Sequence, residues 1–180
     1  MWHPRCVPTD PDDVWVAALV EETARKSALV WLRQPDALRS LPAWHVFTDG
    51  AIHVVGGGQE QRLPDVADGA DLEVTLRSKD TGGRLVRVMA SATQVLAGTA
   101  AWERVVPDLH AKRLNPPDGE EQPHRWARES TVLRLDPIGR PLEFPGHLSH
   151  RSHAAEPAPS AATTRGALPF VLGRRARRRR

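Results

Sequence analysis

An Asp-Gly pair at positions 49 and 50 limits the folds open to this chain more than any other feature. It lies within "AWHVFTDGAIHVVGGG", residues 43–58, where apolar and polar residues alternate on both sides of the pair. Asp-Gly suits the two-residue turn of a β-hairpin because both turn positions need positive φ angles, and alternation is the period of a half-buried strand. The stretch therefore predicts an antiparallel hairpin.

A second hairpin is predicted from "DLEVTLRSKDTGGRLVRVMASATQVL", residues 71–96, with Asp80–Gly83 as its turn. Its second arm is long enough to bend from one sheet into another, as barrels require. The apolar run "SALVWLR", residues 27–33, and the alternating "STVLRLDPI", residues 130–138, add two further strands.

Two stretches carry helical signals. Residues 9–27, "TDPDDVWVAALVEETARKS", begin with Asp and Pro capping signals and continue with amphipathic spacing. Residues 98–119 place apolar side chains at helical spacing, with a break expected at Pro107 and a stop at the Asn-Pro-Pro that follows. The element order predicts a mainly β fold, an antiparallel barrel of five or six strands flanked by helices, because closure removes exposed edges.

The chain of 180 residues, 40% of them hydrophobic, predicts one folded domain. We expect an N-terminal extension over residues 1–13, the barrel over 14–138 and a disordered Pro/Ala/Arg-rich tail over 139–180. The net charge of +3 is a property of the tail, because the segment from Arg151 onward holds eight Arg and a single acid. This tail is the only part of the chain for which we consider nucleic-acid binding. It lacks the interleaved aromatic residues that a base-stacking surface requires.

Two further features bear on location and redox chemistry. No stretch approaches the roughly 18 apolar residues that span a bilayer, and the first residues lack a secretory pattern. We therefore expect a cytoplasmic protein with no membrane partner. The single cysteine, Cys6, cannot form an internal disulfide or a thiolate metal site.

Together, "ALVWLR", "AWHVFTDGAIHVVGGG", "LEVTLRSKDTGGRLVRVMASATQVL" and "AAWERVVPDLHAKRLN" resemble the pyridoxamine 5'-phosphate oxidase-like split barrels. The resemblance covers about residues 14–136 and rests on the order of the elements. It implies a split β-barrel flavoprotein that binds FMN, or alternatively a deazaflavin. It also implies a homodimer and an oxidoreductase that transfers hydride to or from a small organic substrate.

A flavin nucleotide needs cations for its phosphate, a flat apolar wall for its ring and amides for the ring edge. Cations just before the second turn could bind the phosphate. Trp31 and Trp44 could pack near the ring, and the Gly-rich loop could supply amides for its edge. The residues that we expect to bind the cofactor are Arg33, Trp44, Gly57, Gly58, Gln59, Arg77, Ser78 and Lys79. No catalytic residue is assigned.

Alternatives remain open. Strand alternation puts Ser78 on the side opposite Arg77 and Lys79, so these residues could be solvated charges beside a turn. In the resembled family a basic pair follows the Gly-containing loop, whereas this chain has Glu60 there. The alternative function is a non-catalytic or haem-type binding module whose basic tail contacts acidic partners.

No metal site is expected. His147, His150 and His153 have a spacing of three in "HLSHRSH", but they lie in a Pro-flanked stretch that favours a solvated His-rich segment. His45 and His53 lie on opposite arms of the first hairpin, and the turn does not force them into a metal-binding pair.

Overall fold

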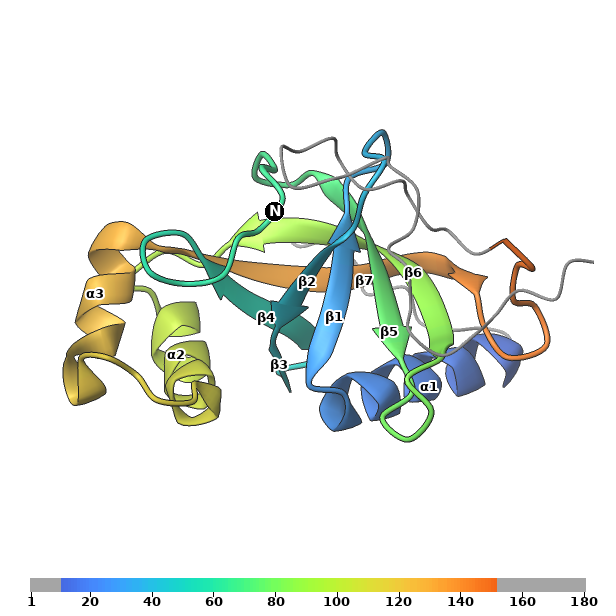
Figure 1. Cartoon of the computed structure of the whole chain (residues 1–180), viewed down its shortest axis with the longest axis horizontal. Coiled ribbons are helices and arrows are strands. Elements are labelled where there is room, and N and C mark those ends of the chain that lie inside the picture. Colours follow the sequence, from blue (N-terminus) through green and yellow to red (C-terminus); the bar gives the residue numbers. More distant parts are fainter. Residues whose placement is uncertain (1–10, 152–180) are drawn as a thin grey trace, which may run out of the picture.

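The computed structural model describes residues 11–151, which form a curled antiparallel sheet with helices around it (Figure 1). Cys6, His153 and the Arg-rich tail lie outside the described residues. The elements in chain order are α1 (Pro11–Lys26), β1 (Leu29–Arg33), β2 (Leu41–Trp44), β3 (Val46–Thr48), β4 (Ala51–Gly56), β5 (Asp71–Arg77), β6 (Arg84–Gln94), α2 (Ala100–Lys112), the 3₁₀ turn η1 (Gly119–Glu121), α3 (Gln122–Glu129) and β7 (Thr131–Glu143).

One extended segment, residues 41–48, closes the sheet into a barrel. The strand order is β2-β1-β5-β6-β7-β4-β3, so β2 and β3 form the two edges, yet they follow one another in the chain with His45 between them. β2 pairs with β1 and β3 pairs with β4, all antiparallel. The barrel is therefore nearly closed, and the edge strands are two halves of one stretch of chain.

The predicted fold class is confirmed. The described residues contain seven strands rather than five or six, because the pairing of residues 41–48 changes from one edge to the other at His45. β7 continues through Pro137 to Glu143, beyond the predicted end at residue 138, and pairs with β6 along the way.

The helices differ from the prediction at two places. α2 runs unbroken through Pro107, which is solvent-exposed. The carbonyl that loses its amide partner there, that of Glu103, belongs to an exposed residue of the helix, where water can satisfy it. α3 was not predicted, because its eight residues have few apolar positions and only Trp126 is a large buried one.

Both predicted turns are present. Asp49 and Gly50 have φ angles of 51° and 71°, as a two-residue hairpin turn requires. In the second hairpin the Ser78 amide donates to the Gly83 carbonyl at 2.8 Å, so the bend has begun by Ser78.

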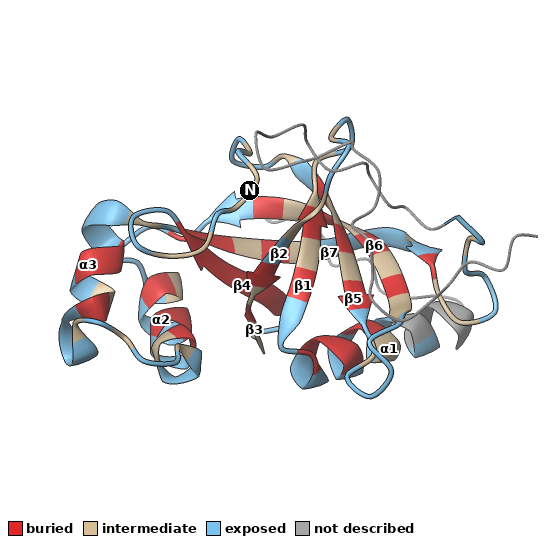
Figure 2. Cartoon of the chain, in the orientation of Figure 1, coloured by how far each residue is buried: buried red, intermediate tan, exposed pale blue. Residues whose placement is uncertain are grey.

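Side chains of the strands sort between two apolar clusters. Buried and less buried residues alternate along β1, β5 and β6 (Figure 2). The larger cluster fills the barrel with residues such as Val30, Leu32 and Val74. The smaller cluster lies between the outer side of the barrel and the arm formed by α2 and α3, and it includes Val55, Leu109 and Trp126. β4 is buried along its whole length because it faces both clusters.

Two histidines are buried in this arrangement, and each has a lowered pKa. Burial lowers the pKa of His45 to about 4, although its Nε2 donates to the Ala24 carbonyl at 2.8 Å. Burial, followed by the nearby charge of Arg134, lowers the pKa of His53 to about 4. Both imidazoles are therefore neutral at pH 7.

Among the described residues, no helix is both long and apolar enough to cross a bilayer.

The two histidines predict acid sensitivity. Because their folded pKa of about 4 lies below the ordinary value of 6.5, the unfolded state takes up protons first as the pH falls. Stability is fully present above pH 6.5 and is lost progressively down to pH 4. Between pH 6.5 and 5 each histidine should remove about 2 kcal/mol from the free energy of unfolding, as urea melts at each pH will show.

The matched variants are His53→Leu and His124→Leu, since His124 is exposed on α3. His53→Leu should flatten the pH dependence by about half, whereas His124→Leu should leave it unchanged. An unchanged slope in His53→Leu would contradict the prediction.

Candidate functional site

A groove on the outer face of β1, β5 and β6 is the strongest candidate site. It has a volume of about 400 Å³. Alternation creates it, because Val30 and Leu32 point into the barrel and so turn Trp31 and Arg33 outward. Its lining residues are Trp31, Arg33, Ala37, Leu38, Ser40, Glu73, Thr75, Arg77, Arg84 and Arg87. We call it the arginine groove.

Ion pairs run across this face in a row of alternating charge. Glu73 binds Arg33 at 2.5 Å and Arg87 at 3.2 Å. Glu143, at the end of β7 and 3% exposed, binds Arg87 at 3.2 Å and Arg84 at 2.6 Å. These pairs hold three arginines in fixed positions along the groove.

Arg77 is the exception in the row. Its guanidinium lies 5.6 Å from the ring centroid of Trp31, in a cation–π contact. Within residues 11–151 no carboxylate forms an ion pair with it. The four arginines of the groove thus face two carboxylates, Glu73 and Glu143, which leaves two positive charges for an anionic ligand.

The structure separates the residues that were expected to bind the cofactor. Arg33 and Arg77 line the arginine groove together. Ser78 and Lys79 belong to the β5–β6 turn and do not line it. The Ser78 hydroxyl accepts a hydrogen bond from the Thr81 amide at 3.3 Å, so it stabilises the turn.

Of the other four expected residues, Gly57, Gly58 and Gln59 lie in the loop after β4 and Trp44 lies at the end of β2. Trp44 packs against Trp126, with ring centroids 6.3 Å apart. A Cβ atom on Gly58 would lie 3.1 Å from the carbonyl oxygen of Glu129, and one on Gly57 would lie 3.5 Å from it. Together with their positive φ angles, this close approach to the α3–β7 junction explains the glycines without a ligand. Gln59 is exposed in the same loop.

Two neighbours of these glycines are structural residues that the sequence did not reveal. The Gln61 side chain accepts from the Trp44 amide at 2.7 Å and donates to the Trp44 carbonyl at 2.9 Å and the Val55 carbonyl at 3.0 Å. Its amide therefore takes the place of a strand residue where β2 ends, beside the switch at His45.

Glu60 is the second of these residues, and its side chain is 1% exposed. Its carboxylate accepts hydrogen bonds from Arg113 at 2.9 Å, Arg125 at 3.1 Å, Gln122 at 2.8 Å and the Trp126 indole at 3.1 Å. Burial alone would raise the pKa of Glu60, but the hydrogen bonds from Trp126, Arg125 and Arg113 lower it. Glu60 is thus an ionised anchor that ties the α2–α3 arm to the barrel.

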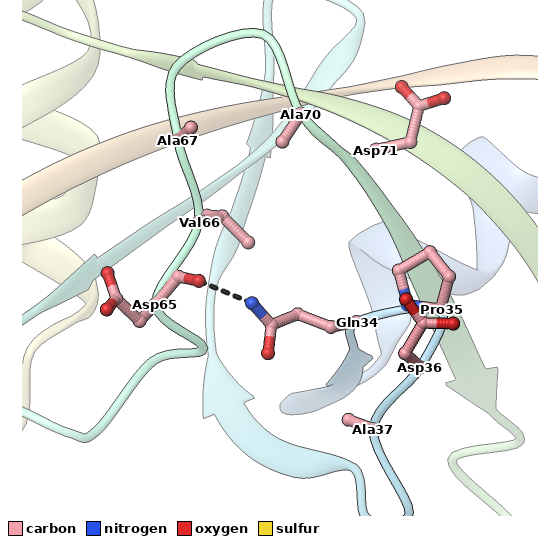
Figure 3. A pocket seen from close by; sticks show the side chains of 9 residues that line it. All are labelled: Gln34, Pro35, Asp36, Ala37, Asp65, Val66, Ala67, Ala70 and Asp71. Atoms are coloured by element: carbon pink, nitrogen blue, oxygen red, sulfur yellow. Dashed lines mark hydrogen bonds between the residues drawn. The ribbon is translucent and has the colours of Figure 1, made fainter.

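A second pocket, of about 380 Å³, lies between the β1–β2 connection and the β4–β5 loop (Figure 3). The Gln34 side chain donates across it to the Asp65 carbonyl. The carboxylates of Asp65 and Asp71 lie on different sides of the pocket and do not converge. No cation or aromatic ring lines it, so it does not suit an acidic ligand. Within residues 11–151 no cluster of His, Cys, Asp and Glu suits a metal ion.

Comparison with known proteins gives matches of fold. No family model and no curated protein sequence matches the chain. The solved structure of HutZ, described as the haem-storage protein of Vibrio cholerae, is 15% identical with a TM-score of 0.49 and covers 69% of this chain and 92% of its own. Campylobacter jejuni ChuZ is 11% identical with a TM-score of 0.47 and covers 82% of this chain and 66% of its own.

The expectation of FMN, or of a deazaflavin, as cofactor is wrong. In this chain the expected phosphate and ring-edge residues do not form one site, since Gly57, Gly58 and Trp44 pack around the arm whereas Arg33 and Arg77 line the arginine groove. The neighbour HutZ is described as a haem-storage protein. Flavin-dependent hydride transfer therefore has no support, and membership in the resembled oxidase-like family is not shown.

The anchoring role of Glu60 makes a prediction about stability. Glu60→Ala should lower the free energy of unfolding by about 3–5 kcal/mol, because it leaves the buried Arg125 without one of its carboxylate partners. Glu60→Gln keeps the shape and one acceptor oxygen and should cost less. Urea melts followed by tryptophan fluorescence measure both.

Glu129→Ala is the matched control. Glu129 is 45% exposed at the end of α3 and lies 3.9 Å from Arg128, so its loss should change stability by about 0.5 kcal/mol at most. If Glu60→Ala were no more harmful than Glu129→Ala, the anchor would be disproved.

Proposed function

We propose that this chain is a split-barrel binding module whose arginine groove holds a flat ligand with two acidic groups, haem being the first ligand to test. The observation that carries the proposal is the surplus of two positive charges in the groove, next to the stacked Arg77 and Trp31. The role is that of the haem-type binding module considered above as the alternative to an enzyme.

The charges suit paired carboxylates. Guanidinium groups bind carboxylates through two parallel hydrogen bonds, and the ion-pair row keeps Arg33, Arg84 and Arg87 in place before a ligand arrives. Such preorganisation reduces the entropy lost on binding. Haem carries two propionates on one edge of a planar ring, which matches a surplus of two charges.

The flat part of the ligand has a matching surface. Arg77 and Trp31 already stack on one another, and both guanidinium and indole planes favour contact with a further aromatic ring. Leu38, 89% exposed, adds an apolar side chain to the rim of the groove.

The groove does not suit the iron of haem as well as it suits the propionates. None of its lining residues is a His, Cys, Met or Tyr, the side chains that bind haem iron. Recognition in the groove itself should therefore depend on the acidic groups and the ring.

This feature gives a direct test. Titrations of the full chain with hemin and with iron-free protoporphyrin IX, followed by absorbance and by tryptophan quenching, should give dissociation constants within about threefold of each other. Arg77→Gln should weaken both ligands about tenfold, the loss of roughly 1.4 kcal/mol for one charged hydrogen-bonded contact.

Arg104→Gln is the control, because Arg104 is 61% exposed on α2 and does not line the groove. It should bind both ligands as the wild type does. Failure of both ligands to bind, or hemin binding unaffected by Arg77→Gln, would refute the groove as the site.

We also propose a homodimer, as the resemblance implied. Leu29 is 45% exposed on β1, and the 89% exposed Leu38 lies in the next connection, so apolar side chains stand beside the groove on this face. A second copy could cover them. Light scattering after gel filtration should show a dimer for the wild type and a monomer for Leu38→Glu; a monomeric wild type would contradict this.

A further inference from the structure

The chain that follows β7 returns to the rim of the arginine groove. Residues 144–151, which we call the strap, begin with Phe144 packed against the barrel core. The His147 amide donates to the Phe144 carbonyl at 2.8 Å, and the two rings lie 4.5 Å apart. The strap is thus a turn with contacts of its own and not a loose end.

One side chain fastens the strap to the barrel. Arg84 donates from Nη2 to the Ser149 carbonyl at 2.7 Å and from Nη1 to the Arg151 carbonyl at 3.4 Å. Its Nε lies 2.6 Å from the carboxylate of Glu143. Arg84 also lines the arginine groove, so a single guanidinium faces both the strap and the candidate ligand site.

The Arg84 guanidinium can bind the strap and an anionic ligand at the same time. A guanidinium has five N–H donors. Ser149 and Arg151 each accept from one terminal N–H and Nε faces Glu143 in an ion pair, which leaves one donor on each terminal nitrogen. An anion in the groove can therefore bind Arg84 without displacing the strap carbonyls. Glu143 also holds Arg87 at 3.2 Å, which fixes the second groove cation relative to the first.

We propose that Arg84 couples the strap to the groove, so that an anionic ligand tightens the strap and the strap holds Arg84 in its binding position. This inference rests on the proposed function and adds that the strap responds to the ligand in the groove. Glu143 holds Arg84 through Nε, and the strap carbonyls and an anion share its two terminal nitrogens. Ordering of these terminal nitrogens by one partner therefore makes binding of the other more favourable. Because coupling between two sites is reciprocal, each should strengthen the other.

Hydrogen exchange of the full chain, read by mass spectrometry on a peptide that covers residues 146–151, tests the two parts separately. Without ligand, Arg84→Lys should speed exchange in the strap by about fivefold, because lysine keeps the charge but lacks the fork that reaches both carbonyls. Arg77→Lys is the matched control and should leave the strap unchanged. Exchange in β5 serves as the internal measure that each variant is folded.

With saturating hemin, exchange in the strap of the wild type should slow by about fivefold, and the Arg84→Lys strap should not respond. If hemin binds and wild-type strap exchange is unchanged or faster, the coupling is overturned. If hemin does not bind by absorbance, the proposed function and the ligand response fail together, while the ligand-free comparison still decides whether Arg84 fastens the strap. Equal ligand-free exchange in Arg84→Lys and wild type would overturn that attachment.

Discussion

The barrel depends on residues 41–48 supplying both of its edges. A sheet of this kind would otherwise expose two rows of unpaired backbone groups, but β2 and β3 pair with β1 and β4 and leave only a short opening at His45. Gln61 covers the end of β2 there by bonding both backbone groups of Trp44. Closure fixes which side of each strand faces outward, and so it fixes where the groove and the arm can lie.

The outer side of the barrel is divided between two kinds of interaction. Around the arm, burial is nearly complete and one carboxylate, Glu60, is surrounded by donors. Across β1, β5 and β6, the charged side chains stay half-buried and bind one another in a row. The charges around Glu60 bind one another and stabilise the fold. The arginine groove has two more positive charges than carboxylates, so only the groove suits an anionic ligand.

An interaction could be predicted from the sequence when its residues lie close together in the chain, and could not when they lie far apart. The hairpins depend on neighbouring residues: the first was found from Asp49 and Gly50 and the second from the turn at 80–83, each with the strand pattern beside it. Arg33 and Arg77, two of the cations named from the sequence, line the arginine groove together. The partners of Glu60 lie 53 to 66 residues away in the chain, so no local pattern shows that a Gly-rich loop packs against α3 and is not free for a ligand.

The Glu60 anchor also bears on the order in which the chain folds. The arm is an excursion between β6 and β7, whose own pairing brings its two ends together. Glu60 follows β4, which pairs with β7 at Gly56 and Thr131, so until β4 and β7 pair, Arg113 and Arg125 must close loops of 53 and 65 residues to reach Glu60. We therefore expect the helices of the arm to dock after the barrel strands have paired, so that a longer tip of the arm would slow folding little.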